Sequence, residues 1–117
     1  MSAEEIFEQR MRLGRLFDLY GGLLTDKQRN CLNMYFYDDL SLSEISEELG
    51  VSRQAVHDLL KRVEQTLEKY EEKLGLLAKN DADKEQLRAV IDLLTHHDGA
   101  GKNEAVNILV KMCGEGR

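Results

Sequence analysis

The stretch S-L-S-E-I-S-E-E-L-G-V-S-R-Q-A-V-H-D-L-L-K-R, residues 41–62, decides how this chain of 117 residues folds. Leu42, Ile45 and Leu49 recur at spacings of three and four, which predicts one apolar face of a short helix. Gly50 follows where a helix needs a residue that tolerates a left-handed backbone. A second helix is expected to start after Ser52, and its predicted buried face is Ala55, Val56, Leu59, Leu60 and Val63. The pattern predicts a helix-turn-helix, in which small side chains let the two helices cross closely.

The exposed face of the second helix is the candidate nucleic-acid-binding site, because this helix normally enters the major groove of DNA. The residues assigned to the site are Ser52, Arg53, Gln54, His57, Lys61 and Arg62. An arginine offers a forked donor to guanine, and a glutamine amide pairs with adenine. The same apolar spacing also suits any amphipathic helical hairpin, so a protein-binding role for this unit stays open.

The charge of the chain argues against a general nucleic-acid binder. The formal net charge is −6 at pH 7, and much of it lies between residues 38 and 60. Arg53 is the one basic residue there, and the acidic ones are Asp38, Asp39, Glu44, Glu47, Glu48 and Asp58. Non-specific affinity for DNA needs clustered Lys and Arg. A single unit should therefore bind DNA poorly, unless dimerisation compensates or the motif contacts protein instead.

The segments before the motif read as two further helices, in line with a composition without proline or tryptophan that predicts an all-α fold. The first helix is expected from Ala3 to Tyr20, and its inward stripe is Ile6, Leu13, Leu16, Phe17 and Tyr20. Thr25 with Gln28 and Ser41 with Glu44 are both spaced as capping boxes. Each box predicts the start of a helix.

The second helix of the motif is predicted to be long, since no Gly or Pro follows until Gly75. Apolar residues alternate steps of four and three as in a coiled-coil seam: Val56, Leu60, Val63, Leu67, Tyr70, Leu74 and Leu77. Two interpretations remain open. Either the seam packs on the chain's own helices, or it contributes to a homodimer, which we expect for this chain.

The C-terminal part is expected to add two short amphipathic helices. Residues 79–83 form a predicted polar break, followed by a helix from Glu85 to Thr95 and a loop over residues 96–101. Asn103 is the predicted cap of the last helix. These helices are too small to stand alone, so they should cover the N-terminal unit, the long helix or a second copy. We therefore expect a unit at residues 1–75 and a helical extension at residues 76–117.

Other classes of function find little support in the sequence. No apolar run is long enough to span a membrane and no secretion signal opens the chain, so the cytoplasm is the expected compartment. Cys31 and Cys113 are expected to be reduced, with Cys31 in the core. The run from His96 to Asp98 resembles a solvated helix end more than a metal site. We expect no enzymatic activity and no cofactor.

Residues 24–62 resemble region 4 of bacterial sigma factors. The shared features are Leu-Thr-x-x-Gln-Arg at 24–29, Tyr35 and Tyr37, Leu-Ser-x-x-Glu-Ile at 40–45, and Leu-Gly-Val-Ser-Arg at 49–53. This resemblance implies a helix that reads promoter DNA, with Ser52, Arg53, Gln54, His57 and Lys61 as its contacts.

The chain as a whole is more similar to the YlxM family of small helix-turn-helix proteins from Gram-positive bacteria. The similarity rests on M-R-L-G-R-L-F-D-L-Y-G-G-L-L-T-D-K-Q-R at 11–29, followed by Tyr35-Phe36, Asp39 to Leu42 and Glu44-Ile45. Genes of that family lie beside those of the signal recognition particle GTPase and its receptor. The resemblance implies either a DNA-binding regulator acting in that pathway, or an accessory protein that contacts the RNA or protein of the particle. A purely structural helical adaptor is the third possibility.

Overall fold

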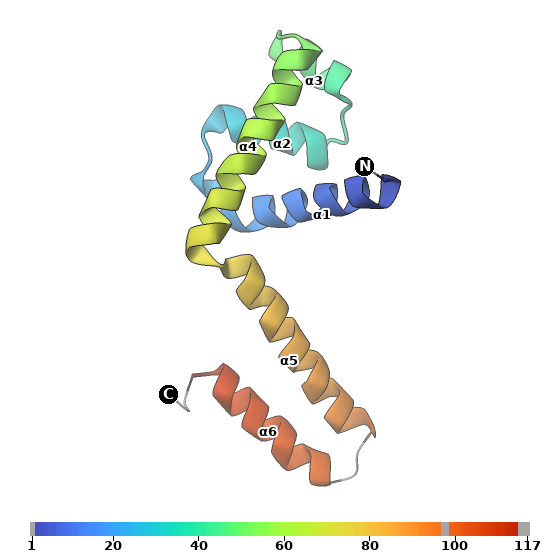
Figure 1. Ribbon diagram of the computed structural model, residues 1–117, viewed down its shortest axis with the longest axis vertical. Helices are drawn as coiled ribbons and strands as arrows, with labels where there is room; N and C mark the ends of the chain where they lie inside the picture. The colour runs from blue at the N-terminus through green and yellow to red at the C-terminus, as the bar shows by residue number, and fades with distance from the viewer. Residues whose placement is uncertain (1, 97–98, 115–117) are drawn as a thin grey trace. The chain divides into compact units, whose positions relative to one another are not determined.

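The computed structural model describes residues 2–96 and 99–114, and the regular elements in these ranges are all helical (Figure 1). They are α1 (Ala3–Tyr20), the 3-10 helix η1 (Gly21–Leu23), α2 (Asp26–Phe36), α3 (Leu42–Leu49), α4 (Arg53–Leu74), α5 (Leu76–His96) and α6 (Ala100–Met112). The chain divides into two compact units, an N-terminal unit of Met1–Leu77 and a C-terminal unit of Ala78–Arg117. The all-α helix-turn-helix class predicted from the sequence is confirmed.

The starts of the N-terminal helices follow the local cap signals. The Thr25 hydroxyl accepts from the Gln28 backbone N–H, and the Gln28 side chain accepts from the Thr25 N–H, so the predicted capping box is present. The box of Ser41 and Glu44 forms in the same way at the start of α3. In α1 the buried stripe is shorter than predicted, because Ile6 is 55% exposed and burial begins at Leu13. The first turns of α1 extend past the helices that bury the rest of it.

Two apolar clusters hold the N-terminal unit together, and α4 contributes to both. The larger cluster consists of Leu13, Leu16, Phe17, Tyr20, Leu24, Leu32, Val63, Leu67 and Leu77. The smaller one joins Cys31 of α2, Ile45 of α3 and Val56 of α4. Cys31 is thus the core residue that the sequence predicted, and burial raises the pKa of its thiol. Ser46 is buried and donates its hydroxyl to the Ser43 carbonyl, which lets α3 lie close to α4.

Most of the heptad seam packs on the chain's own helices, whereas Leu74 at the end of α4 is 55% exposed, contrary to the prediction. Val56, Val63 and Leu67 are fully buried, and Leu60 and Tyr70 pack against the larger cluster. This is the first of the two interpretations left open by the sequence, and a contact with a second copy would need another surface. Ala55, predicted to be buried, is exposed. It lies about 100° around the helix from Val56, beyond the edge of the apolar face.

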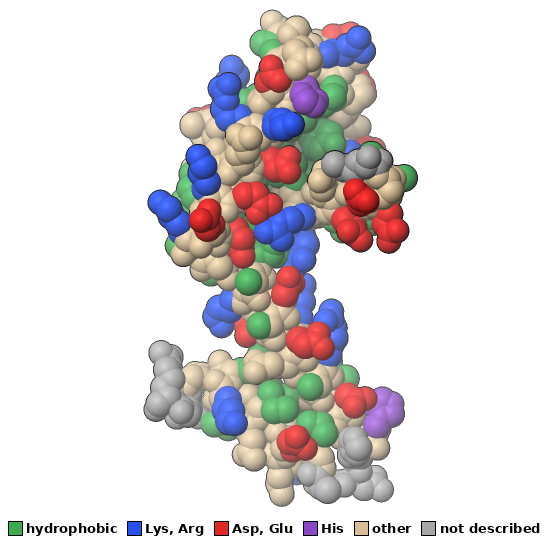
Figure 2. Space-filling view, viewed as in Figure 1, with side chains coloured by type: hydrophobic (Ala, Val, Ile, Leu, Met, Phe, Trp, Pro, Cys, Tyr) green, Lys and Arg blue, Asp and Glu red, His purple; other side chains and the backbone are tan. Residues whose placement is uncertain are grey.

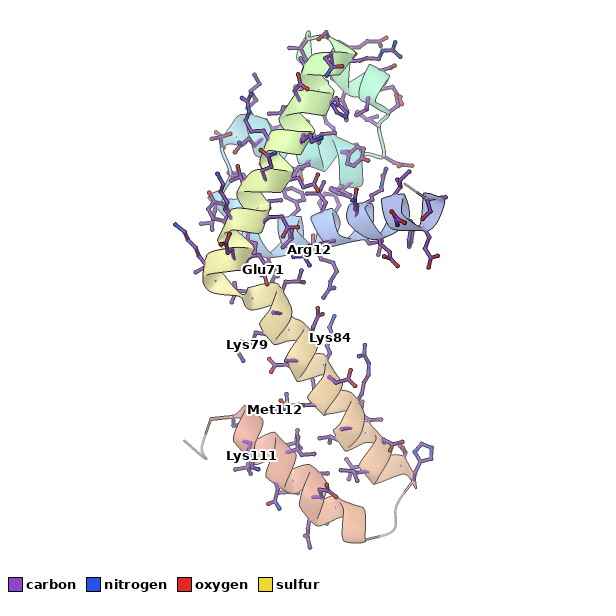
Figure 3. All side chains as sticks on the ribbon, in the orientation of Figure 1. Arg12, Glu71, Lys79, Lys84, Lys111 and Met112 are labelled. Carbon is purple, nitrogen blue, oxygen red and sulfur yellow. The ribbon has the colours of Figure 1, made fainter. Side chains whose placement is uncertain are left out.

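Polar contacts tie the end of α4 and the start of α5 to α1. The Tyr20 hydroxyl donates to Glu71 Oε1 over 2.6 Å and accepts from the Leu76 backbone N–H over 3.0 Å. Glu71 Oε1 also accepts from the Leu77 N–H over 2.9 Å. One turn earlier on α4, the Arg12 guanidinium donates to both oxygens of Glu68, over 2.7 and 2.8 Å. Figure 3 labels Arg12 of α1 and Glu71 of α4. These contacts fix α4 against α1, and with it the direction of the helix that carries the candidate site.

The C-terminal unit differs from the sequence prediction in two places. Helix α5 runs without interruption from Leu76 to His96, so the polar break at residues 79–83 is wrong. Lys79 pairs with Asp83 one turn further on, which makes these residues an exposed helix face. Helix α6 starts at Ala100, after Gly99 with φ of 50°, so Asn103 lies inside the first turn and does not cap the helix. His97 and Asp98 of the considered metal site lie outside the described residues.

Candidate nucleic-acid interface

The turn between α3 and α4 sets the direction of the candidate recognition helix. Gly50 has φ of 67°, the left-handed conformation expected at this position, and its N–H donates to the Ser46 and Glu47 carbonyls. The Val51 N–H also donates to the Ser46 carbonyl, over 3.0 Å. Ser52 then caps α4, because its hydroxyl accepts from the Ala55 N–H over 3.0 Å. Residues 50–52 fold as local sequence rules require, and they leave the first turn of α4 exposed.

A surface hollow joins the N-terminal turns of α3 and α4. It is lined by Ser41, Leu42, Ser43, Arg53, Gln54 and His57, and no carboxylate is among these lining residues. Arg53 Nη1 donates to Ser43 Oγ over 3.4 Å, which holds the guanidinium between the two helices. Both helix N-termini at this hollow are already capped, by Ser41 and Glu44 on α3 and by Ser52 on α4. The Arg53 guanidinium is therefore the charge that the hollow offers to an anion, and a phosphate is the anion that nucleic acids present.

Asp58 engages two side chains of the candidate site, Gln54 and His57. The Gln54 amide Nε2 donates to Asp58 Oδ1 over 2.9 Å, and His57 Nδ1 lies 3.7 Å from the same oxygen. The side chains of His57 and Asp58 are 58% and 60% exposed, so water or a ligand can compete for these contacts. Base reading by Gln54 would require the amide to leave the carboxylate or to turn its oxygen outward.

The structure groups most of the predicted site residues and separates one of them. Arg53, His57 and Lys61 follow one another at one-turn spacing along α4, with Gln54 beside them. All of these are exposed. Arg62 is exposed as well, but it lies nine residues from Arg53 and thus about half a turn around the helix. The Ser52 side chain is used by its own cap.

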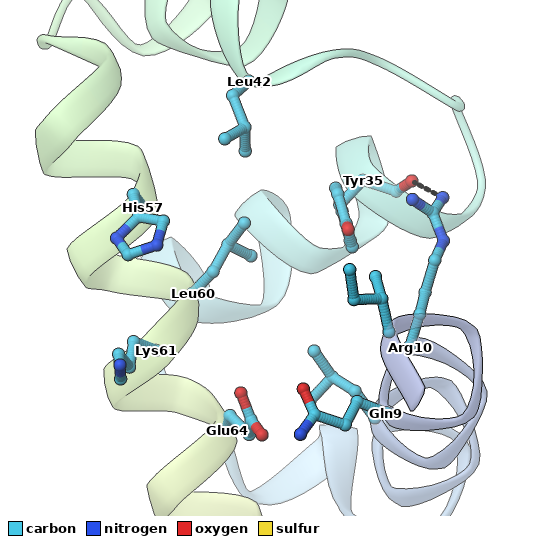
Figure 4. Close-up of a pocket in the computed structure, with 10 residues that line it drawn as sticks. Gln9, Arg10, Tyr35, Leu42, His57, Leu60, Lys61 and Glu64 are labelled. Atoms are coloured by element: carbon cyan, nitrogen blue, oxygen red, sulfur yellow. Dashed lines mark hydrogen bonds between the residues drawn. The ribbon is translucent and has the colours of Figure 1, made fainter. Parts of the chain in front are cut away.

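A second hollow borders this strip and contains residues that the sequence analysis missed (Figure 4). His57, Lys61 and Glu64 of α4 lie on one side of it, and Gln9 and Arg10 of α1 on the other. Its apolar lining is Ile6, Leu13, Tyr35, Leu42 and Leu60. The Arg10 guanidinium stacks 4.3 Å from the centre of the Tyr35 ring and donates to the Tyr35 carbonyl. No local sequence signal links positions 9–10 with 57–64, because only the tertiary fold brings them together.

The acidic residues of α3 gather around a different hollow. It is lined by Leu40, Glu44, Glu47 and Glu48, and it shares no lining residue with the hollow at Arg53. The backbone N–H of Ser41, and then its hydroxyl, lower the pKa of Glu44, so this carboxylate keeps its charge in mildly acidic solution. The three glutamates of α3 therefore share a surface of their own, whereas Asp58 lies on the candidate face of α4.

The described residues contain neither a metal-binding cluster nor a membrane-spanning helix. No group of three or more His, Cys, Asp or Glu side chains in residues 2–96 and 99–114 could hold a metal ion. Among the helices in the same ranges, none is long and apolar enough to cross a membrane.

Comparison with known proteins identifies the family of the chain. Residues 7–106 match the family UPF0122, described as "Putative helix-turn-helix protein, YlxM / p13 like". A UPF0122 protein of Desulforamulus reducens is 50% identical over 103 residues, which cover 88% of this chain and 86% of that protein. One from Geobacillus kaustophilus is 46% identical over 95 residues, covering 81% of this chain and 86% of its own length. The chain therefore belongs to the UPF0122 family of YlxM-like helix-turn-helix proteins.

Proposed function

We propose that this protein is a DNA-binding regulator that places the N-terminal half of α4 in the major groove. The observation that carries the proposal is the exposed strip of Arg53, His57 and Lys61 on α4, which borders the hollow lined by Ser41, Ser43 and Gln54. The strip starts at the helix N-terminus, the end that meets base edges in helix-turn-helix complexes. The acidic side chains of α3 surround another hollow and do not line this one.

Each side chain of the strip has a distinct role in this proposal. Arg53 can give two parallel hydrogen bonds to guanine once it leaves Ser43, and Gln54 can pair with adenine once it leaves Asp58. Lys61, two turns further along the helix, contributes a phosphate contact, which positions the helix without reading sequence. His57 stands between them and can contact either a base or a phosphate.

The charge balance predicts weak binding by a single copy. Between Arg53 and Arg62, α4 carries three basic residues and one acidic residue, whereas the whole chain carries a net charge of −6. Few phosphate contacts give little counterion release, so the affinity should be modest at physiological salt. We infer that specific binding uses two copies, each contacting one half of a two-part site.

Binding of the protein to DNA duplexes at 20 mM salt tests the proposal. One duplex has a random sequence, and the others carry promoters that lie near the genes of this family. Fluorescence anisotropy should show a complex for the wild type that is weakened about tenfold or more in a double variant with Arg53→Ala and Lys61→Ala. Circular dichroism of both proteins provides the folding control, since both side chains are exposed. Equal affinity of the folded double variant would refute this function.

A second function is favoured by the acidic hollow of Leu40, Glu44, Glu47 and Glu48. Such a surface matches a basic protein surface, which steers association electrostatically. In this alternative the chain is an accessory protein of the signal recognition particle, and it contacts a protein of the particle through this surface without binding DNA. Pull-down of the reconstituted particle would then be lost when Glu47 and Glu48 are both changed to Lys, and would persist with Arg53→Ala.

In both alternatives we propose that the chain acts in the cytoplasm, without a cofactor and without catalysing a reaction. The residues on the strip are donors and charges suited to recognition. A change of DNA or particle binding, measured without added metal or nucleotide, is therefore the appropriate readout of each function.

A further inference from the structure

The C-terminal unit exposes an apolar face that its two helices cannot bury. The exposed fractions are 41% for Leu87, 60% for Ile91 and 54% for Leu94 on α5, and 48% for Val106, 38% for Leu109 and 39% for Val110 on α6. In contrast, Val90 and Ala105 are 4% and 1% exposed. Figure 2 shows hydrophobic side chains gathered over this unit.

Helical periodicity places the six exposed residues on one side of the hairpin. Helix α6 turns back along α5 (Figure 1), and the buried residues Val90 and Ala105 mark where the two helices face each other. At about 100° per residue, Leu87, Ile91 and Leu94 lie about 60°, 100° and 40° around α5 from Val90. Val106, Leu109 and Val110 lie about 100°, 40° and 140° around α6 from Ala105, in the same sense of rotation. Because the helices run in opposite directions, these rotations point to the same side, so the six residues form one face.

The size of this face suits a modest protein interface. Helix α6 has 13 residues and is about 20 Å long, and two helices side by side are about 20 Å wide. A footprint of about 400 Å² lies within the range of the largest apolar patch on an ordinary monomer, a patch that is often functional. It is about half of one side of a standard interface, so we expect a weak dimer.

The charges of the two units indicate what covers the face. Residues 1–77 carry ten basic and fifteen acidic side chains, whereas residues 78–117 carry six basic and seven acidic ones. Two copies would repel each other through their N-terminal units but not through their nearly neutral C-terminal units. The face has no excess charge that would select an acidic or a basic partner. Its match is therefore a surface of the same kind.

We propose that the α5–α6 face, defined by Leu87, Ile91, Leu94, Val106, Leu109 and Val110, binds the same face of a second copy. The product is a four-helix bundle with two-fold symmetry, in which each hairpin buries the other's apolar residues. The seam of α4 takes no part, because Val56, Val63 and Leu67 are already buried within one chain. This dimer does not depend on DNA binding, and it would supply the two N-terminal units that a two-part DNA site needs.

Sedimentation velocity of the full chain between about 1 and 100 μM tests the dimer, with Ile91→Glu as the disrupting variant. Ile6→Glu is the matched control, since Ile6 is also a helical isoleucine and is 55% exposed, but it lies on α1. The wild type and Ile6→Glu should dimerise alike. Ile91→Glu should weaken the dimer about 30-fold or more, because two apolar contacts are lost and two charges are brought together.

A crosslink provides a second test that does not depend on a disruptive change. In a Cys113→Ala background, Ile91→Cys should form a covalent dimer with a short bis-maleimide, while Ile6→Cys should not. A wild type that stays monomeric at 100 μM would overturn the proposal. So would dimerisation that survives Ile91→Glu, or binding of the monomer to lipid vesicles through the same face.

Discussion

Asp58 should lower the affinity for DNA if α4 enters the major groove, because its carboxylate repels phosphates. Its carboxylate accepts from the Gln54 amide over 2.9 Å and lies 3.7 Å from His57 Nδ1. Asp58→Asn removes the charge and keeps an oxygen that can accept from Gln54. The substitution therefore separates the effect of charge from the effect of side-chain position, and we expect it to strengthen DNA binding.

The size of the gain follows from the distance to the phosphates. A side chain on the reading face of a groove about 12 Å wide lies about 8 Å from phosphates on both strands. Removing a negative charge at that distance, in water and at 20 mM salt, should strengthen binding about three- to fivefold. At 150 mM salt the Debye length falls to about 8 Å, and the gain should shrink to about twofold or less.

Fluorescence anisotropy titrations of one labelled duplex at both salt concentrations provide the measurement. Glu72→Gln is the charge-matched control, because Glu72 is exposed on the same helix, 14 residues or about 21 Å further along. Its effect should be smaller than that of Asp58→Asn. A fall in affinity for Asp58→Asn, or equal effects of the two variants, would show that Asp58 does not face the phosphates.

Three predictions concern stability. Gly50→Ala should lower the free energy of unfolding by about 1 kcal/mol in urea titrations, because φ of 67° suits alanine poorly; no change would contradict this cause. Tyr20→Phe should lower the melting temperature by roughly 5 °C in circular dichroism, since the 2.6 Å bond to Glu71 is lost. The hydrogen bond from Arg12 lowers the pKa of Glu68 in the folded state. The contribution of this ion pair to the free energy of unfolding is therefore present above the unfolded-state pKa of Glu68, and it is lost as the pH falls through the folded-state pKa. Arg12→Gln should therefore destabilise the protein at pH 7 and have little effect at pH 3; a pH-independent effect would point to packing instead.

The parts of the fold that the sequence predicts are those that depend on neighbours in the chain. The boxes at Thr25 and Ser41 and the left-handed Gly50 form within four residues, so their signals are complete in the sequence. The same holds for the cap at Ser52. These signals explain why the helix-turn-helix could be identified before the structure was known.

The failures in the C-terminal unit have a common physical origin. Asn80, Asp81 and Asp83 are residues that cap helices, but they are equally acceptable on an exposed helix face. The left-handed Gly75 and the hydrogen bonds from Leu76 and Leu77 to Tyr20 and Glu71 start α5 earlier than the polar residues suggest. The bond from Leu76 to Tyr20 joins residues 56 positions apart, and the Glu71 carboxylate that accepts from Leu77 is placed by the same contact. Local sequence patterns do not predict such bonds.

The candidate site was predictable in its composition but not in its surroundings. The period of the helix places Arg53, His57 and Lys61 on one strip, and it also places Arg62 half a turn away from Arg53. The hydrogen bond between Gln54 and Asp58 joins residues i and i+4 of one helix, so this pairing was readable from the sequence. The sequence does not reveal that the hollow beside Lys61 is completed by Arg10, because that contact depends on the tertiary fold.

The salt dependence of DNA binding measures whether one face of α4 meets DNA phosphates. Lys61 and Arg62 are adjacent exposed cations on different sides of this helix. Lys61→Ala should reduce the slope of log affinity against log salt by about 0.9, the value for one lost phosphate contact, and Arg62→Ala should leave the slope unchanged. Equal slopes for the two variants, or no complex of the wild type at 20 mM salt, would show that the face of α4 with Lys61 does not meet DNA phosphates.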